Sequence, residues 1–281
     1  MAGLSKSFSC FDRIFNEAFS EKYYLSIRIN PDGLFYSVYD PSESKYIGFE
    51  SVILAGAAEI YNYITEHSLL KRKFQHKACI FPVSKYTLLP KHLIINGKEE
   101  DYFNFAHHKN QDEVIGSHNL MSDDITMIFA LDIKWSHLIN DHFEEAMKYP
   151  SPAAFIDTLI PKYRTARTSG LFIDIHEDHF DLLIMENGKL RYCNNFNYKS
   201  PEDLVYYTIF VIDQLGVDIE KTELKLSGSV NEKSAIFRLL RKYIRSVELI
   251  NFEDEVRLSY ALSDIPLYSY PELFNSRLCE L

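Results

Sequence analysis

Three apolar runs separated by short polar breaks lie between Gly170 and Asn195, and they constrain the fold more than any other stretch of the chain. The runs are Leu171 to Ile175, Phe180 to Met185 and Leu190 to Asn194. Asn187-Gly188 supplies the two positive φ angles that a two-residue type I′ hairpin requires. The segment therefore predicts three consecutive antiparallel strands.

The same order of elements occurs earlier in the chain. The elements expected in the first copy are strands at 24–29, 34–39 and 46–49, a helix within 51–70 and a strand at 77–81. In the second copy, the three strands above precede a helix from about Ser200 and a strand at 223–226. The β-β-β-α-β order thus recurs at an offset of about 147 residues, which indicates an internal duplication of architecture. A helical crossover to a parallel neighbour gives each copy a mixed sheet, so we expect an α/β protein with two lobes.

The remaining segments complete the predicted domain organisation. We expect a polar, loosely held leader over 1–21, a first lobe over 22–165 and a second lobe over 166–281. A subdomain is expected as an insertion into the first lobe, at about 83–124. The further elements expected are a strand at 125–131, helices at 132–147, 153–163 and 232–245, a strand at 247–251 and a last helix at 271–279.

Composition excludes several classes of protein. A hydrophobic content of 46% supplies a sizeable core, while the net charge of −10 disfavours a nucleic-acid partner. The four cysteines are scattered without a C-x-x-C motif, as is typical of reduced thiols in the cytoplasm. The sequence contains no run of 18 apolar residues and no apolar signal region at its start, so we expect no membrane span.

Several segments resemble the actin-like ATPase superfamily, which has a ribonuclease H-like fold. FIDIHEDHFDLLIMENGKLRYCNN, at 172–195, resembles the second-lobe phosphate segment, especially in the cell-division and pilus-assembly branch. LKLSGSV, at 224–230, resembles the strand and glycine-rich loop that in that family approach the nucleotide. ACIFPVSKYTLLP and MIFALDIKWSHLINDHFEEA resemble first-lobe segments. The chain is also similar to an uncharacterised bacterial family with an actin-like ATPase fold. The resemblance implies a duplicated actin-like fold.

The chain departs from that family at the positions expected to bind Mg-ATP. In the family, each lobe presents an Asp at a strand end and then a glycine turn that admits phosphate. In the first lobe, YYLSIRINPDG has Arg28 or Asn30 where the Asp is expected. The second lobe keeps Asp174, but His176 replaces the glycine, and any Cβ there disfavours a positive φ. These changes predict that catalysis is lost, so no catalytic residue and no cofactor are expected.

The resemblance nevertheless implies a vestigial nucleotide site at Asp174, His176, Ser227, Gly228 and Ser229. Simpler interpretations exist for most of these residues. Asp174 is equally well explained as a strand-end residue paired with a cation or a backbone donor. The two serines are interpreted as caps of a helix that begins near Asn231.

The turn at 176–179 contains two histidines and two carboxylates, His176, Glu177, Asp178 and His179, which are ligand types that suit Zn²⁺, Ni²⁺ or Mn²⁺. We interpret it as a solvated hairpin turn and expect no metal, because charged residues ordinarily occupy loops.

Two functions from different classes remain. The first is a non-catalytic actin-like scaffold that binds a protein partner. The second is a nucleotide-binding ATPase or switch that uses Asp174 and the Ser227-Gly228-Ser229 loop. The chain is rich in Tyr and Phe, which are favoured in protein interfaces but also fill cores. We expect some of the following aromatic residues to be exposed: Tyr206, Tyr207, Phe210, Tyr260, Tyr268 and Tyr270.

Overall fold

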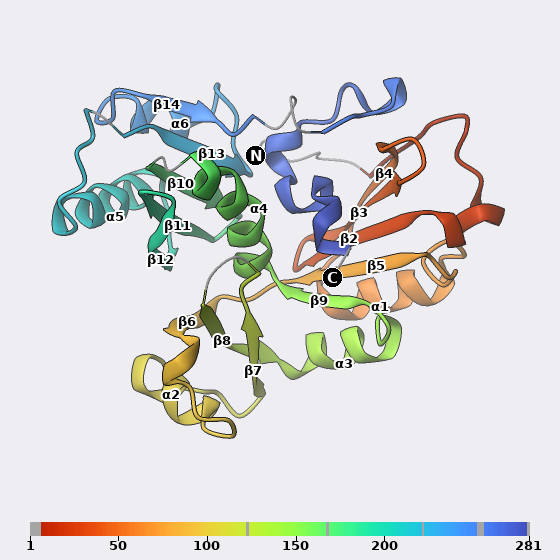
Figure 1. The fold of residues 1–281 in the computed structure, drawn as a ribbon, viewed down its shortest axis with the longest axis horizontal. Helices are drawn as coiled ribbons and strands as arrows, with labels where there is room; N and C mark the ends of the chain where they lie inside the picture. Colours follow the sequence, from red (N-terminus) through yellow and green to blue (C-terminus); the bar gives the residue numbers. More distant parts are fainter. Residues whose placement is uncertain (1–6, 122–123, 167–168, 221, 252–255, 280–281) are drawn as a thin grey trace.

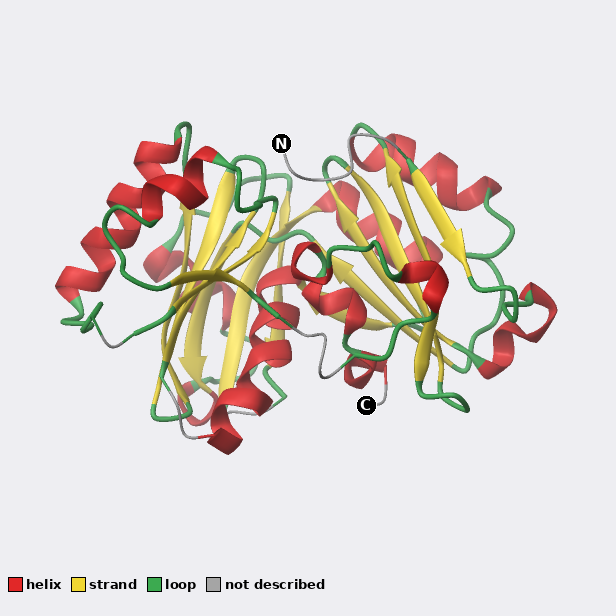
Figure 2. Ribbon diagram, turned by 90° about the horizontal axis from the view of Figure 1, so that it is seen from above, coloured by secondary structure: helices red, strands yellow, loops and turns green. Residues whose placement is uncertain are grey.

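The computed structural model describes residues 7–121, 124–166, 169–220, 222–251 and 256–279 (Figure 1). Two lobes are each built on a mixed sheet, and a third, small sheet lies beside them. The two large sheets stand side by side with helices on their outer faces (Figure 2). No helix in the described part of the chain is long and apolar enough to cross a membrane.

The first lobe contains a six-stranded sheet in the order β1-β4-β3-β2-β5-β9. Its strands are β1 (Phe8–Phe11), β2 (Tyr24–Asn30), β3 (Gly33–Asp40), β4 (Lys45–Ile53), β5 (His76–Phe81) and β9 (Met147–Pro150). β5 runs parallel to both β2 and β9, whereas the other neighbours are antiparallel. Its helices are α1 (Gly56–Glu66) and α3 (Ile133–His142), which pack together, and α4 (Ser151–Ala166), which lies between the lobes.

The second lobe contains a five-stranded sheet in the order β12-β11-β10-β13-β14. Its elements are β10 (Gly170–Ile175), β11 (His179–Glu186), β12 (Lys189–Asn197), α5 (Pro201–Gln214), β13 (Leu224–Gly228), α6 (Ala235–Leu240) and β14 (Val247–Leu249). Asn187 and Gly188 have φ angles of 52° and 76°, as the predicted type I′ hairpin requires. The order β12-β11-β10-β13 repeats β4-β3-β2-β5 of the first lobe, so the predicted duplication of mixed sheets is confirmed.

The small sheet has the order β6-β8-β7 and is antiparallel throughout. Its elements are β6 (Lys85–Pro90), α2 (Glu99–Ala106), β7 (Glu113–Asn119) and β8 (Ile125–Asp132). Phe103 of α2 packs on Ile128 and Ala130 of β8 to form a separate small core. The segment 83–124, which we expected as an insertion, contains β6, α2 and β7. The third strand of the small sheet, β8, comes after that segment.

The inner face of the first sheet is covered by the last part of the chain, residues 256–279, which we call the C-terminal segment. Its short 3₁₀ turns are η3 (Tyr260–Leu262), η4 (Leu267–Ser269), η5 (Pro271–Phe274) and η6 (Ser276–Cys279). The turns η5 and η6 pack on β2, and η5 also contacts α4, while η4 contacts β13 of the other lobe. One hydrophobic core therefore joins the C-terminal segment, α4 and the facing sides of both sheets.

Several predicted boundaries are wrong. The leader is not loosely held over its described part, because Phe8–Phe11 pairs with β4 as an edge strand; residues 1–6 lie outside the described residues. The helix expected at 132–147 ends at His142, since 147–150 pairs with β5 instead. The helix expected at 232–245 is only Ala235–Leu240. The helix expected at 271–279 is two 3₁₀ turns interrupted by the extended backbone of Asn275.

Candidate functional site

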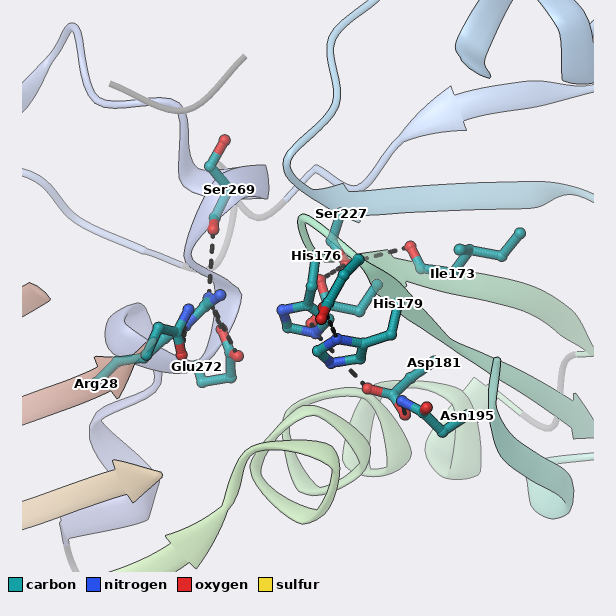
Figure 3. A network of polar contacts seen from close by, with 12 residues as sticks. Arg28, Ile173, His176, His179, Asp181, Asn195, Ser227, Ser269 and Glu272 are labelled. Atoms are coloured by element: carbon teal, nitrogen blue, oxygen red, sulfur yellow. Dashed lines mark hydrogen bonds and ion pairs between the residues drawn. The ribbon is translucent and has the colours of Figure 1, made fainter. Parts of the chain in front are cut away.

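The candidate site lies between the lobes, where β2 and β10 turn their inner faces toward each other. Side chains alternate along both strands, so Leu25 and Ile27 face away from the site and Arg28 faces into it. On β10, Asp174 faces inward. Figure 3 shows the polar network that these residues form with the C-terminal segment.

Asp174 is 2% exposed and accepts a 2.7 Å hydrogen bond from the hydroxyl of Ser227 on β13. Its other oxygen, Oδ2, lies 3.2 Å from Nε2 of His176. Burial alone would raise the pKa of Asp174, but the charge and close contact of His176, the charge of Arg28 and the hydrogen bond from Ser227 lower it to about 2. Asp174 is therefore ionised inside the protein, between two charged groups, His176 and Arg28, and the hydroxyl of Ser227.

Gly228 ends β13 with a φ of +81°, a conformation that disfavours other residues. A Cβ at this position would lie 2.2 Å from the carbonyl oxygen of Ile175 and 2.8 Å from Oδ1 of Asp174. The backbone N–H of the next residue, Ser229, donates to the same Ile175 carbonyl at 2.7 Å, and its side chain is exposed. This glycine is thus required by close contact with the neighbouring strand β10.

His176 is buried, with 8% exposure, which contradicts the interpretation of the 176–179 turn as simply solvated. Its carbonyl accepts a 2.6 Å hydrogen bond from the hydroxyl of Tyr198. Nε2 lies 3.2 Å from Asp174 Oδ2 and 3.6 Å from Asp181 Oδ2. Burial lowers the pKa of His176, but the charge of Asp174 and the close contacts with both carboxylates outweigh it and raise the pKa to about 10.

His179 and Asp181 of β11 extend the network. The ring of His179 stacks on that of His176, with centroids 4.4 Å apart, and its Nδ1 lies 2.6 Å from Oδ1 of Asp178. Asp181 is 2% exposed and accepts hydrogen bonds from the Tyr86 hydroxyl at 2.8 Å and the Asn195 amide at 3.2 Å. Because Tyr86 belongs to β6, the small sheet also contributes to the site.

Arg28 and Glu272 form the other half of the network, on the side of the first lobe. The guanidinium Nη1 of Arg28 lies 3.4 Å from each oxygen of Glu272 and 3.5 Å from the carbonyl oxygen of Ser269. Burial raises the pKa of the Glu272 carboxyl, and the positive charge of Arg28 opposes that rise. Glu272 is 0% exposed, so a carboxylate of the C-terminal segment is enclosed between the lobes.

Four of the five predicted site residues come together: Asp174, His176, Ser227 and Gly228. Neither serine caps a helix near Asn231 as interpreted, because Ser227 bonds to Asp174 and α6 is capped instead by Ser234, which accepts from the N–H of Phe237. Sequence reasoning missed Glu272, Asp181 and Tyr86 as members of the site. Of the first-lobe residues of the site, only Arg28 was named from the sequence, as one of two residues standing where the family has an Asp.

Two surface pockets lie elsewhere. One, of about 440 Å³, is lined by Glu100, Asn104 and residues 107–111. The other, of about 220 Å³, lies against β7, β8 and α3. None of the predicted nucleotide-site residues lines either pocket.

Comparisons with known proteins identify both a family and a fold. A family model described as "Protein of unknown function (DUF3822)" matches residues 12–247. A crystal structure from Bacteroides thetaiotaomicron, of a protein with an actin-like ATPase fold and unknown function, is similar at 26% identity and a TM-score of 0.76, covering 85% of this chain and 94% of that one. The PilM-PilN type IV pilus biogenesis complex contains a chain that is 11% identical, with a TM-score of 0.61, over 89% of this chain and 96% of that one. No curated protein matches. The actin-like fold that the sequence predicted is confirmed.

Proposed function

The chain belongs to DUF3822, a family of proteins of unknown function, and from that premise we propose that it is a non-catalytic actin-like scaffold that binds a protein partner. The observation that carries the proposal is the position of Glu272. Its carboxylate is buried against Arg28 of β2, and it lies near enough to Asp174 of β10 for the charge of Asp174 to raise its pKa. In the actin-like ATPase superfamily that the sequence resembles, the ends of these two strands bind the phosphates of the nucleotide and Mg²⁺.

The chemistry of the surrounding groups supports the same proposal. Carboxylates repel phosphate, and Asp174, Asp181 and Glu272 are each no more than 2% exposed here. Gly228 is in close contact with the backbone of β10, which limits the room for a phosphate to approach it. A nucleotide would have to displace the C-terminal segment, which contributes Leu273, Phe274 and other apolar side chains to the main hydrophobic core.

Exposed aromatic residues on α5 support a protein partner. Tyr206 is 64% exposed and Phe210 51% exposed, and their rings stack with centroids 6.3 Å apart. Exposed aromatic side chains are enriched in the centres of protein interfaces. The PilM-type structural relative was solved in complex with another protein, PilN, so this fold supports binding to a polypeptide.

A thermal-shift titration with Mg-ATP, Mg-ADP and Mg²⁺ alone tests the first part of the proposal, that the protein does not act through a bound nucleotide. A ligand at 100 times its dissociation constant that binds only the folded protein adds about 2.7 kcal/mol of stability, which is visible as a shift in Tm. We expect no nucleotide-dependent shift at millimolar concentration. A saturable shift that Asp174→Ala abolishes would instead establish the nucleotide-switch alternative.

The second part of the proposal, that a protein partner binds at α5, is tested by comparing surface variants. A partner captured by the wild-type protein should be lost with the double variant Tyr206→Ser/Phe210→Ser. Tyr243→Ser, which changes another exposed aromatic residue outside α5, is the matched control and should keep the partner. Equal recovery with the α5 variant and with the control would exclude α5 as the binding surface.

A further inference from the structure

The interior between the lobes contains more carboxyl groups than permanent cations. Asp174, Asp181 and Glu272 are each at most 2% exposed, and the guanidinium of Arg28 is the permanent cation paired with Glu272 among the described residues. Buried charges are ordinarily paired or bound to a metal, because removing an ion from water is costly. The imbalance lies on the side of the second lobe, around Asp174 and Asp181.

His176, His179 and Asp181 each offer one ligand atom at this place, and these atoms all lie within 4.8 Å of one another. We propose that the three side chains bind a divalent transition-metal ion, Zn²⁺ in the first place, as a structural site at the start of β11. Two imidazoles and a carboxylate form an N₂O ligand set of the kind that Zn²⁺ accepts. Mg²⁺ and Ca²⁺ prefer sites made of oxygen atoms alone.

The separations of the ligand atoms suit a small tetrahedral ion. Ligands about 2.1 Å from such an ion are about 3.4 Å apart. Nε2 of His176 lies 3.6 Å from Oδ2 of Asp181, which is close to this separation. His176 Nε2 makes no hydrogen bond of good geometry to a described residue, although it is buried beside two carboxylates. A metal ion would satisfy this nitrogen.

Two of the three ligands already have a partner for their other polar atom, as is common in established metal sites. Asp178 lies 2.6 Å from Nδ1 of His179, which leaves Nε2 of that ring to bind the ion. Oδ1 of Asp181 accepts from Tyr86 and Asn195, which leaves Oδ2 to bind the ion. In each case the second polar atom of the ligand already has a partner.

The turn that carries the ligands is fixed by backbone contacts. The N–H of His176 donates to the carbonyl of His179 at 2.9 Å, and Tyr198 bonds to the turn twice, through its hydroxyl to His176 and its N–H to Asp178. The two histidine rings are stacked, so the His179 ring must rotate to point its nitrogen at the ion. The rest of the site is organised before the metal binds, which favours affinity.

Metal competition on the full-length, untagged protein tests this proposal. After treatment with a chelator, the protein is titrated with Zn²⁺ against a chromophoric chelator, and with Co²⁺ while the visible absorption of tetrahedral cobalt is followed. We expect one equivalent of Zn²⁺ to bind, and the variants His179→Gln and Asp181→Asn to lower the affinity by more than about 100-fold. Asp178→Asn should lower it by about 10- to 100-fold, as for other outer groups.

Glu177→Gln is the matched control, because it removes a carboxylate from the same turn that is not one of the proposed ligands; its affinity should stay within about 3-fold of the wild type. Thermal unfolding of each variant in chelator verifies that it folds, and His179→Gln changes the most exposed of the three ligands and so disturbs the fold least. The proposal is overturned if folded His179→Gln binds Zn²⁺ as tightly as Glu177→Gln does, or if the wild type gives no tetrahedral Co²⁺ spectrum.

Discussion

The guanidinium of Arg28 and the carboxylate of Glu272, 244 residues apart in the sequence, meet at 3.4 Å with side-chain exposures of only 6% and 0%. Arg28 comes from the second strand of the first lobe, and Glu272 from a short turn near the end of the chain. The pair joins the first lobe to the C-terminal segment at the point where the second lobe presents Asp174. Its energetics therefore measure how firmly this segment is held between the lobes.

Removing one partner of this pair should be strongly destabilising. Arg28→Leu leaves a buried carboxylate, and Glu272→Leu leaves a buried guanidinium, so we expect each to lower the free energy of unfolding by about 3–5 kcal/mol. The double variant should cost clearly less than the sum, because an apolar pair is often tolerated where a buried ion pair was. Urea unfolding of the four proteins gives these values. Additive losses would mean that the two charges do not interact in solution.

Stability at low pH should depend on Glu50 of β4. Burial alone would raise its pKa, but hydrogen bonds from His67, Tyr63, Tyr36 and Ser9 lower it from 4.5 to about 2. A carboxyl group whose pKa is lowered by folding stabilises the protein above its unfolded pKa and loses that effect as the pH falls through the folded value. The contribution should therefore be complete above pH 4.5 and disappear toward pH 2.

Glu50→Gln tests this prediction. Unfolding free energies measured from pH 6 to pH 2 should fall less steeply in the variant, by about 1–2 kcal/mol over the range once partial solvation of the group is allowed for. Glu66→Gln changes an exposed carboxylate of α1 and is the control. If both variants show the wild-type slope, the hydrogen bonds to Glu50 do not lower its pKa.

Gly228 should be required for folding, independently of any ligand. Gly228→Ala forces a side chain into a φ of +81° and places its Cβ 2.2 Å from the Ile175 carbonyl oxygen, so we expect a loss of about 3 kcal/mol or more. Gly97 offers a matched control, because its φ is +82° but a Cβ added there would have nothing within 4 Å. Gly97→Ala should cost only about 1–2 kcal/mol. Similar losses at both positions, measured by urea unfolding, would show that the contact with Ile175 relaxes without cost.

The strands at the centre of each lobe were predictable because their pattern is local. The runs around Ile27, Tyr36 and Ile173 are apolar and bounded by turn residues, and Asn187-Gly188 marks a hairpin by its chemistry alone. By contrast, Met147–Pro150 becomes a strand only because β5 offers a partner edge, so this short stretch of sequence carried no sign of it. The duplication was visible because it repeats an order of elements rather than a set of residues.

The site was only half predictable, for a related reason. Asp174 and Gly228 lie in segments with a recognisable pattern, and the structure places them in contact. His176 lies beside Asp181 of the next strand, and Asp181 in turn accepts a hydrogen bond from Tyr86 of the small sheet, which is 95 residues away from it in the sequence. Glu272 lies in a 3₁₀ turn that has no periodic pattern, so nothing in the sequence indicated that its carboxylate is enclosed.

The C-terminal segment should behave as part of the core and not as a mobile tail. Leu273 is fully buried in the main core, and its carbonyl accepts a hydrogen bond from the hydroxyl of Ser37 on β3. We expect Leu273→Ala to lower the free energy of unfolding by about 2–5 kcal/mol, as a large-to-small change in a packed interior does. Tyr260→Ala, at a 94% exposed position of the same segment, should change it by less than about 0.5 kcal/mol. Urea unfolding distinguishes the two. Equal and small effects would mean that the segment leaves the space between the lobes in solution. The C-terminal segment would then no longer be a reason to exclude a nucleotide from that space.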